Sequence, residues 1–211
     1  MRVRVIALSR QVGTAGEEVA NLVADELKLR VIDYQVIQDA AREAGVSPET
    51  VSEAERAPSL LTRFLEALAR NPGIPVAAWA DPIPLTTTPL YTSNDYRSLI
   101  ENVIRNLGTQ GNCLIIGHAA QVILKDRVDV LRVLITGSVQ PRVRRVMQGM
   151  GVDEKAAHKT VEKTDAERNE FFRRFYEMRW TDASNYDVCI STDTLAPADA
   201  ASVIVAAARV W

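Results

Sequence analysis

Residues 8–16 of the chain, Leu8-Ser9-Arg10-Gln11-Val12-Gly13-Thr14-Ala15-Gly16, join an apolar segment to an amphipathic one. Residues 2–8 are dominated by Val, Ile and Leu and predict a buried strand, whereas residues 16–28 repeat apolar side chains at helical spacing and predict a helix. In a parallel α/β sheet, the first strand-to-helix turn is the usual place where a phosphate group binds. This turn therefore decides both the expected fold and the first candidate site.

The two glycines of the turn, Gly13 and Gly16, lie three residues apart. Glycines at such positions let backbone N–H groups converge on an anion, which is the physical basis of a phosphate loop. The strict pattern G-x-x-x-x-G-K-[S/T] is absent, because no glycine of the chain is followed by lysine. Spacing alone therefore leaves a purely structural turn as an alternative.

Strands and helices alternate along most of the remaining chain. Further strands are predicted at residues 30–33, 112–117, 128–137 and 185–192. A helix is predicted from residue 96, with its stop between Gly108 and Gly111. Such alternation predicts a parallel sheet of about five strands covered on both faces by helices, which is a three-layer α/β/α architecture.

The middle of the chain does not follow this alternation. Ser47-Pro48 predicts the start of a helix, and residues 58–70 are amphipathic at helical spacing. Residues 72–89 hold five of the nine prolines and predict a long loop, which is either a functional lid or a disordered connection. We therefore expect an inserted, mainly helical region.

The composition is that of one soluble globular domain: 25 Lys+Arg stand against 27 Asp+Glu, the formal net charge is −2, and 47% of residues are hydrophobic. The near-neutral balance argues against a general nucleic-acid coat protein. No apolar run approaches the ~18 residues of a membrane span, and the opening segment is too short for a signal peptide. We expect a cytoplasmic protein without nucleic-acid or membrane partners, and the oligomeric state stays open.

Cysteine and histidine are scarce. Cys113 and Cys189 each lie in an apolar run and are predicted to be buried core thiols. His118 and His158 are the only histidines, which leaves little basis for a zinc hydrolase or a Ser/His triad.

Six segments, in order, make the chain resemble the cytidylate kinase-like family of P-loop kinases. Residues 8–20 are similar to the family's motif I-S-R-Q-x-G-S-G-G-R-E-I-A. The other similar segments are Ile32-Asp33-Tyr34, Ala57 to Leu61, Leu114 to Ala120, Glu162 to Arg168 and Asn185 to Thr192. The resemblance implies the P-loop kinase-like fold of nucleoside monophosphate kinases. It implies one domain over residues 1–211, with a core (1–45 and 96–211), an inserted acceptor-binding region (about 46–95) and an arginine-bearing lid (about 142–180).

The resemblance also implies an activity, the transfer of phosphate from ATP, with Mg²⁺, to CMP or dCMP. Phosphoryl transfer is almost entirely positioning and charge neutralisation, so the site needs loop amides, a cation and several arginines. The residues expected to bind ATP are Ser9, Arg10, Gln11, Gly13, Thr14, Ala15, Gly16, Glu17 and Glu18, with Glu18 as the Mg²⁺ ligand. The residues expected to act in transfer are Arg10, Arg142, Asp165, Arg168 and Arg173. The residues expected to bind the acceptor are Asp33, Arg63 and His118.

Several of these residues also have structural explanations. An arginine of the predicted helix that begins near Thr164 could simply pair along a solvated face, as Glu170 could with Arg174. Asp33 could equally cap a helix, and Asp187, at the start of the last strand, is predicted to be structural. The aromatic stripe of this helical segment is predicted to face the core rather than to stack on a base. It comprises Phe171, Phe172, Phe175, Tyr176 and Trp180.

Three positions bear on the activity. The family motif, like this chain at Gly16, has glycine where a phosphate loop usually carries lysine, so Arg10 or a lid arginine must supply that charge. Glu17 and His118 each replace an arginine of the family pattern, and acceptor binding through His118 would weaken as pH rises through its titration. Two other functions are therefore carried forward: a nucleotide-binding or sensing protein without transfer activity, and a kinase of another small acceptor.

Overall fold

The computed structural model describes residues 3–33 and 93–211 of the chain. The predicted helices and the proline-rich loop between residues 34 and 92 lie outside the described residues, and so does Arg63. Within the described ranges, no helix is both long and apolar enough to cross a membrane.

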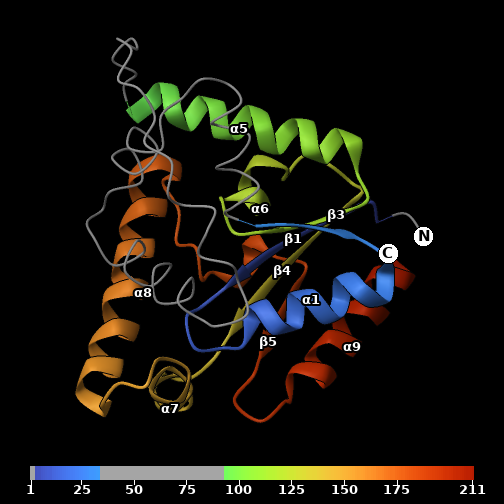
Figure 1. Ribbon diagram of the computed structural model, residues 1–211. Coiled ribbons are helices and arrows are strands. Elements are labelled where there is room, and N and C mark those ends of the chain that lie inside the picture. The colour runs from blue at the N-terminus through green and yellow to red at the C-terminus, as the bar shows by residue number, and fades with distance from the viewer. Residues whose placement is uncertain (1–2, 34–92) are drawn as a thin grey trace, which may run out of the picture.

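The described part of the chain forms one five-stranded sheet in which every pairing is parallel (Figure 1). The strands are β1 (Val5–Arg10), β2 (Arg30–Ile32), β3 (Cys113–Ile116), β4 (Val130–Thr136) and β5 (Val188–Ser191). Their order is β2-β3-β1-β4-β5, so β1 is central and its carboxyl end lies between those of β3 and β4. In an open parallel sheet this central edge is where ligands bind.

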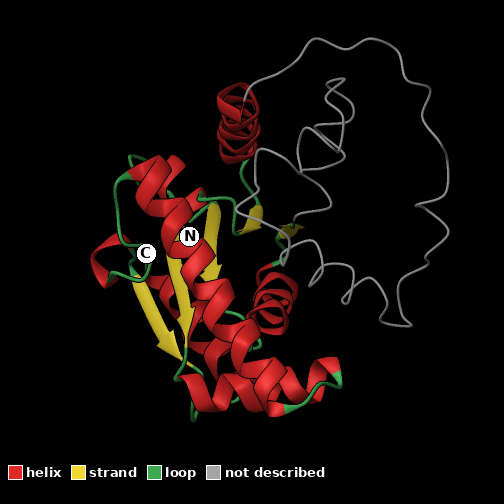
Figure 2. Ribbon diagram, turned by 90° about the vertical axis from the view of Figure 1, so that its left-hand side faces the viewer, coloured by secondary structure: helices red, strands yellow, loops and turns green. Residues whose placement is uncertain are grey.

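Helices cover both faces of the sheet, as the sequence predicted. They are α1 (Gly16–Leu27), α5 (Ser93–Gln110), α6 (Ala120–Ile123), α7 (Val139–Met150), α8 (Glu154–Tyr176) and α9 (Pro197–Val210). Helices α1 and α9 lie on one face, whereas α5 and α6 lie on the other (Figures 1 and 2). Helices α7 and α8 pack against each other beyond the carboxyl edge of the sheet, next to the turn that follows β1.

The predicted starts of two helices need correction, α8 and α5, since α5 begins at Ser93 and not at residue 96, whereas its predicted stop between Gly108 and Gly111 is confirmed. Helix α8 begins at Glu154, well before Thr164, because the Asp153 carboxylate caps it by accepting a hydrogen bond from the backbone N–H of Ala156 at 2.7 Å. Helix α5 ends at Gln110, and Gly111 follows in the left-handed conformation with φ +70°. Gly108 lies within the helix, where a Cβ would lie 2.9 Å from the Leu124 side chain, so the glycine lets α5 approach Leu124 closely.

The core divides into two apolar layers, one on each face of the sheet. Cys113 is fully buried in one of them, as predicted. The prediction for Cys189 was wrong: β5 is an edge strand, and the Cys189 side chain is exposed. Most of the predicted aromatic stripe does face the core: Phe172 of α8 and Trp180 after it are almost fully buried, and Phe171 and Tyr176 pack against the same cluster.

Asp187 has the structural role predicted for it. Its carboxylate accepts a bidentate pair of hydrogen bonds from the Arg132 guanidinium, at 2.9 and 2.5 Å, and a third from the Arg132 backbone N–H at 2.8 Å. These contacts fix the start of β5 against β4. The same carboxylate raises the pKa of Arg132 further above its already high ordinary value, through hydrogen bonding that outweighs burial.

We expect Asp187→Ala to lower the free energy of unfolding by about 2–4 kcal/mol, because it leaves a half-buried guanidinium and a backbone donor without their acceptor. The matched control is Asp182→Ala, which removes an exposed carboxylate that caps a single turn and should therefore cost distinctly less. Equilibrium urea unfolding of both variants measures the difference. Equal costs would contradict the proposed importance of the β4–β5 contact.

Candidate functional site

Side chains hold the turn between β1 and α1, residues 10–16, by donating hydrogen bonds to its backbone carbonyl groups. Five successive carbonyls, those of residues 10 to 14, each accept a hydrogen bond from a side chain. The donors are, in order, the guanidinium of Arg168, the hydroxyl of Thr14, the guanidiniums of Arg142 and Arg145, and the hydroxyl of Thr192. A carbonyl and the N–H of the same peptide point in opposite directions, so these contacts leave the N–H groups facing the inside of the loop.

The loop amides have the arrangement of an anion-binding nest. Gly13 and Ala15 both adopt positive φ angles, +78° and +57°, in alternation with their neighbours. Within the described residues, the backbone N–H groups of Gly13, Ala15 and Gly16 find no acceptor. Gly13 is required here, because a Cβ at this position would lie 2.5 Å from the carbonyl oxygen of Arg142. The structure thus brings together the loop residues that the sequence singled out.

A buried ion pair supports the loop from behind. The Arg142 side chain is only 1% exposed, and its guanidinium binds the Asp165 carboxylate bidentately at 2.7 and 2.8 Å. Its remaining Nε–H donates to the Val12 carbonyl at 2.8 Å. Each of the three guanidinium nitrogens thus donates to an acceptor within the protein. We therefore infer that Arg142 and Asp165, expected from the sequence to act in transfer, position the loop.

Gln11 and Thr14 belong to the same support. Gln11 Oε1 accepts from the Thr136 hydroxyl at 2.5 Å and from the Gly137 N–H at 3.1 Å, while its amide donates to Asp165 at 3.3 Å. Thr14 is fully buried and donates to the Gln11 carbonyl at 2.7 Å. Their side chains therefore hold the turn, and what the turn presents to a ligand is backbone.

Two arginines bring positive charge close to the loop. The Arg10 Nε donates to Glu17 Oε1 at 2.8 Å, and the Arg168 guanidinium lies 4.8 Å from the centre of the Trp180 ring. Burial and the neighbouring Arg10 charge lower the pKa of Arg168 to about 10, so it stays charged at neutral pH. Although burial opposes it, the charge and hydrogen bond of Arg10 hold the pKa of Glu17 below its ordinary value. Two cations thus share this space with one paired carboxylate.

The turn after β3 lies beside these arginines. Gly117, His118 and Ala119 all have positive φ angles, between +52° and +80°, which is an uncommon conformation for the last two. Burial and the charge of Arg10 lower the pKa of His118 to about 4. His118 is therefore neutral between pH 5.5 and 8 in this structure, and the expectation that it titrates in that range does not hold here.

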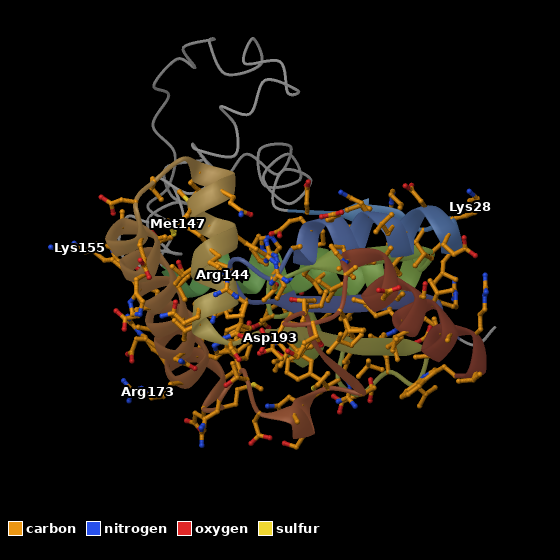
Figure 3. The ribbon with its side chains drawn as sticks, turned by 90° about the horizontal axis from the view of Figure 1, so that it is seen from below. Lys28, Arg144, Met147, Lys155, Arg173 and Asp193 are labelled. Carbon is orange, nitrogen blue, oxygen red and sulfur yellow. The ribbon has the colours of Figure 1, made fainter. Side chains whose placement is uncertain are left out.

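The remaining predicted residues are more dispersed. Arg173 does not reach the loop: its side chain is 74% exposed, pairs with Glu170 at 2.7 Å and lies at the outer edge of the molecule (Figure 3). Ser9 is buried at the end of β1, next to the Tyr186 hydroxyl. Glu18 is exposed on the first turn of α1, and Asp33 is exposed just after β2. Arg63 lies outside the described residues.

Sequence reasoning missed Arg145 and Thr192 as site residues. Arg145 donates to the carbonyls of Gly13 and Thr192, and the Thr192 hydroxyl donates to Thr14, so both hold the loop. The position of Thr192 in the sequence could have indicated this, because it directly follows the last strand and so lies at the same sheet edge as the loop. The spacing of Asp165 and Arg168 did predict that both side chains reach the loop from one helix.

No group of three or more His, Cys, Asp or Glu side chains arranged for a metal ion occurs among the described residues. Mg²⁺ that is bound mainly through substrate phosphates and water needs only one or two protein carboxylates. Glu18 and Asp33 are exposed carboxylates at the carboxyl edge of the sheet. These are the residues that would hold such an ion.

We expect Asp165→Ala to lower the free energy of unfolding by about 3–5 kcal/mol, because it leaves the buried Arg142 charge unpaired. Glu170→Ala, which breaks the exposed pair with Arg173, is the control and should cost less than about 1 kcal/mol. The double variant Arg142→Met/Asp165→Leu should recover stability but not anion binding, since the Val12 carbonyl loses its donor. Urea unfolding and tripolyphosphate calorimetry measure the two effects; equal costs for the single substitutions would disprove the role of the pair.

We expect His118 to make the fold less stable in acid. Its folded-state pKa of about 4 lies below the ordinary value of 6.5, so its contribution is complete above pH 6.5 and falls as pH decreases toward 4. Between pH 7 and 4.5 the wild type should therefore lose more unfolding free energy than His118→Gln. The NMR signal of His118, identified by its absence in that variant, should titrate near pH 4; titration near 6.5 would contradict this assignment.

Comparisons with known proteins show the family and the fold of the chain. The sequence model of the cytidylate kinase-like family matches residues 5–194 of the chain. An uncharacterized protein from Eubacterium ventriosum is similar in structure, with a TM-score of 0.70 at 20% identity over 97% of this chain and 98% of that one. Shikimate kinase from Bacteroides thetaiotaomicron gives 0.53 at 10% identity over 97% and 98%. Shikimate kinase from Acinetobacter baumannii in complex with shikimate gives 0.51 at 13% identity over 96% and 91%.

At these identities the structural likeness shows the fold alone, which is that of P-loop kinases. A search of curated proteins found no match. The family match covers the loop, the turn after β3, both helices that carry the site arginines and the last strand. The chain therefore belongs to the cytidylate kinase-like family.

Proposed function

We propose that this protein transfers the γ-phosphoryl group of ATP to a small acceptor, with CMP or dCMP as the first candidates. The observation that carries the proposal is the loop of residues 10–16, whose carbonyls are held outward while the N–H groups of Gly13, Ala15 and Gly16 find no acceptor among the described residues. A polyphosphate supplies the acceptors that such amides lack.

Each part of the site would have its own task. The loop amides would bind the phosphate oxygens, and Arg10 and Arg168 would neutralise the charge that spreads over the transferred group. The Arg142–Asp165 pair would keep the loop in shape without adding net charge to it. Mg²⁺, when bound with the nucleotide, supplies further neutralisation of the phosphate oxygens.

The identity of the acceptor rests on the family resemblance. The neutral His118 supports a second candidate, because the family pattern has an arginine at this position and the imidazole offers no permanent charge to an acceptor phosphate. An acceptor that carries a hydroxyl group but no phosphate would fit such a position. Shikimate, the compound in one of the similar structures, is a representative of that class.

We expect release of ADP from Mg·ATP in a coupled assay when the correct acceptor is present. The panel is CMP, dCMP, UMP, AMP, GMP and shikimate. Arg168→Ala should lower turnover by about 10²–10³-fold, the usual effect of removing one donor to transition-state charge. Arg209→Ala, which breaks an exposed pair with Glu26 at the far end of α1, is the matched control and should leave turnover unchanged.

The outcomes separate the candidate functions. Turnover with CMP or dCMP supports the first, and turnover with shikimate supports a kinase of another acceptor. ATP binding by a folded protein that turns over none of the panel would favour nucleotide sensing without transfer. A protein that binds no ATP would refute the proposal.

A further inference from the structure

We propose that Arg10 carries the positive charge that a phosphate loop usually takes from a lysine at the position of Gly16, and that Gly16 is glycine because the Arg10 side chain occupies the lysine's place. This inference rests on the proposed function, since it assigns the polyphosphate-binding cation of that same site. On this proposal the loop keeps its positive charge, which Arg10 carries in place of the lysine.

The space above Gly16 is filled by the stem of Arg10. A Cβ at position 16 would lie 2.5 Å from Arg10 Cβ and 2.6 Å from Arg10 Cγ, distances that no relaxed structure contains. These atoms are the base of the side chain, so rotation of its far end cannot relieve the clash. The next nearest atom, Thr14 Oγ1, is 3.4 Å away, which is an ordinary contact. Within the described residues, the stem of Arg10 is therefore what excludes a side chain at position 16.

The far end of Arg10 lies in front of the loop. Its Nε is bound to Glu17 on the first turn of α1, while its Nη1 lies 3.2 Å from where a Cβ of Gly117 would be. The guanidinium thus extends from the amino end of α1 to the turn after β3, in front of the loop amides. Arg168 fixes its starting point by donating to the Arg10 carbonyl. Among the described residues, Glu17 is the one carboxylate paired with Arg10, and this contact uses Nε alone, so both Nη groups stay available for phosphate oxygens.

Glu17 completes the arrangement. The amino end of a helix carries partial positive charge and disfavours a cation. The Glu17 carboxylate offsets this at the end of α1, which lets the guanidinium rest there before a ligand arrives. In this chain the Glu17 charge is thus paired with Arg10 instead of repelling the phosphates.

The test moves the charge back to position 16. Gly16→Lys alone should clash with Arg10 and lower the melting temperature. Arg10→Gly/Gly16→Lys removes both clashing carbons and should restore the melting temperature. Arg10→Ala/Gly16→Lys is the matched control, because alanine keeps the Cβ that lies 2.5 Å away, and it should stay destabilised.

Calorimetry with ATP, and with tripolyphosphate as a probe without a base, measures the function of the charge. Arg10→Gly should weaken the binding affinity for both ligands at least about tenfold, in line with the loss of a charge-assisted contact. Arg10→Gly/Gly16→Lys should regain most of that affinity, and Arg10→Ala/Gly16→Lys should not. Arg209→Ala should bind like the wild type.

Each result decides one point. If Arg10→Gly binds tripolyphosphate like the wild type, or if adding Gly16→Lys to Arg10→Gly rescues neither stability nor binding, the relocation of charge is wrong while the proposed function stands. If the wild type binds neither ATP nor tripolyphosphate, the proposed function fails and the assignment of Arg10 fails with it. Rescue in the Arg10→Gly background and not in the Arg10→Ala background establishes the inference.

Discussion

The candidate site depends on one buried contact, the bidentate pair between Arg142 of α7 and Asp165 of α8. The same guanidinium holds the Val12 carbonyl, and Gly13 lies directly against the Arg142 backbone. Two helices and the loop therefore meet at a single side chain. Because the pair sums to zero charge, it fixes the shape of the loop without adding net charge to it. The positive charge comes from Arg10 and Arg168, of which Arg168 also holds a loop carbonyl.

The unusual features of the chain gather around Arg10. Gly16 lies under its stem, Glu17 pairs with its Nε, and Gly117 and His118 lie next to its guanidinium. Considered one by one, the glycine, the carboxylate and the histidine each look like the loss of a positive charge. Considered together, they form the surroundings of one long cationic side chain, with space for its stem, a counter-charge and a neutral neighbour.

Much of the fold could be predicted because its signals are local. Alternating strand and helix patterns indicated the parallel sheet, and the glycine turn after residue 8 indicated the position of the loop. Side-chain roles were harder, since they depend on contacts between residues far apart in the chain. Arg142 and Arg173 look alike in sequence, yet one is 1% exposed beneath the loop and the other is 74% exposed on the surface. Cys189 was misjudged because an apolar run does not reveal that its strand lies at an edge.

The carbonyls of the loop have another consequence, for the order in which the protein becomes functional. The turn lies near the amino end of the chain, but its supports come from far along it: Arg142 is 130 residues from Val12, and Thr192 is 178 residues from Thr14. Contacts of such long sequence separation form late in folding. During synthesis, the loop sequence is therefore complete long before the loop can hold its shape. Binding of the proposed nucleotide would therefore have to wait for the last strand, at which point the core is complete.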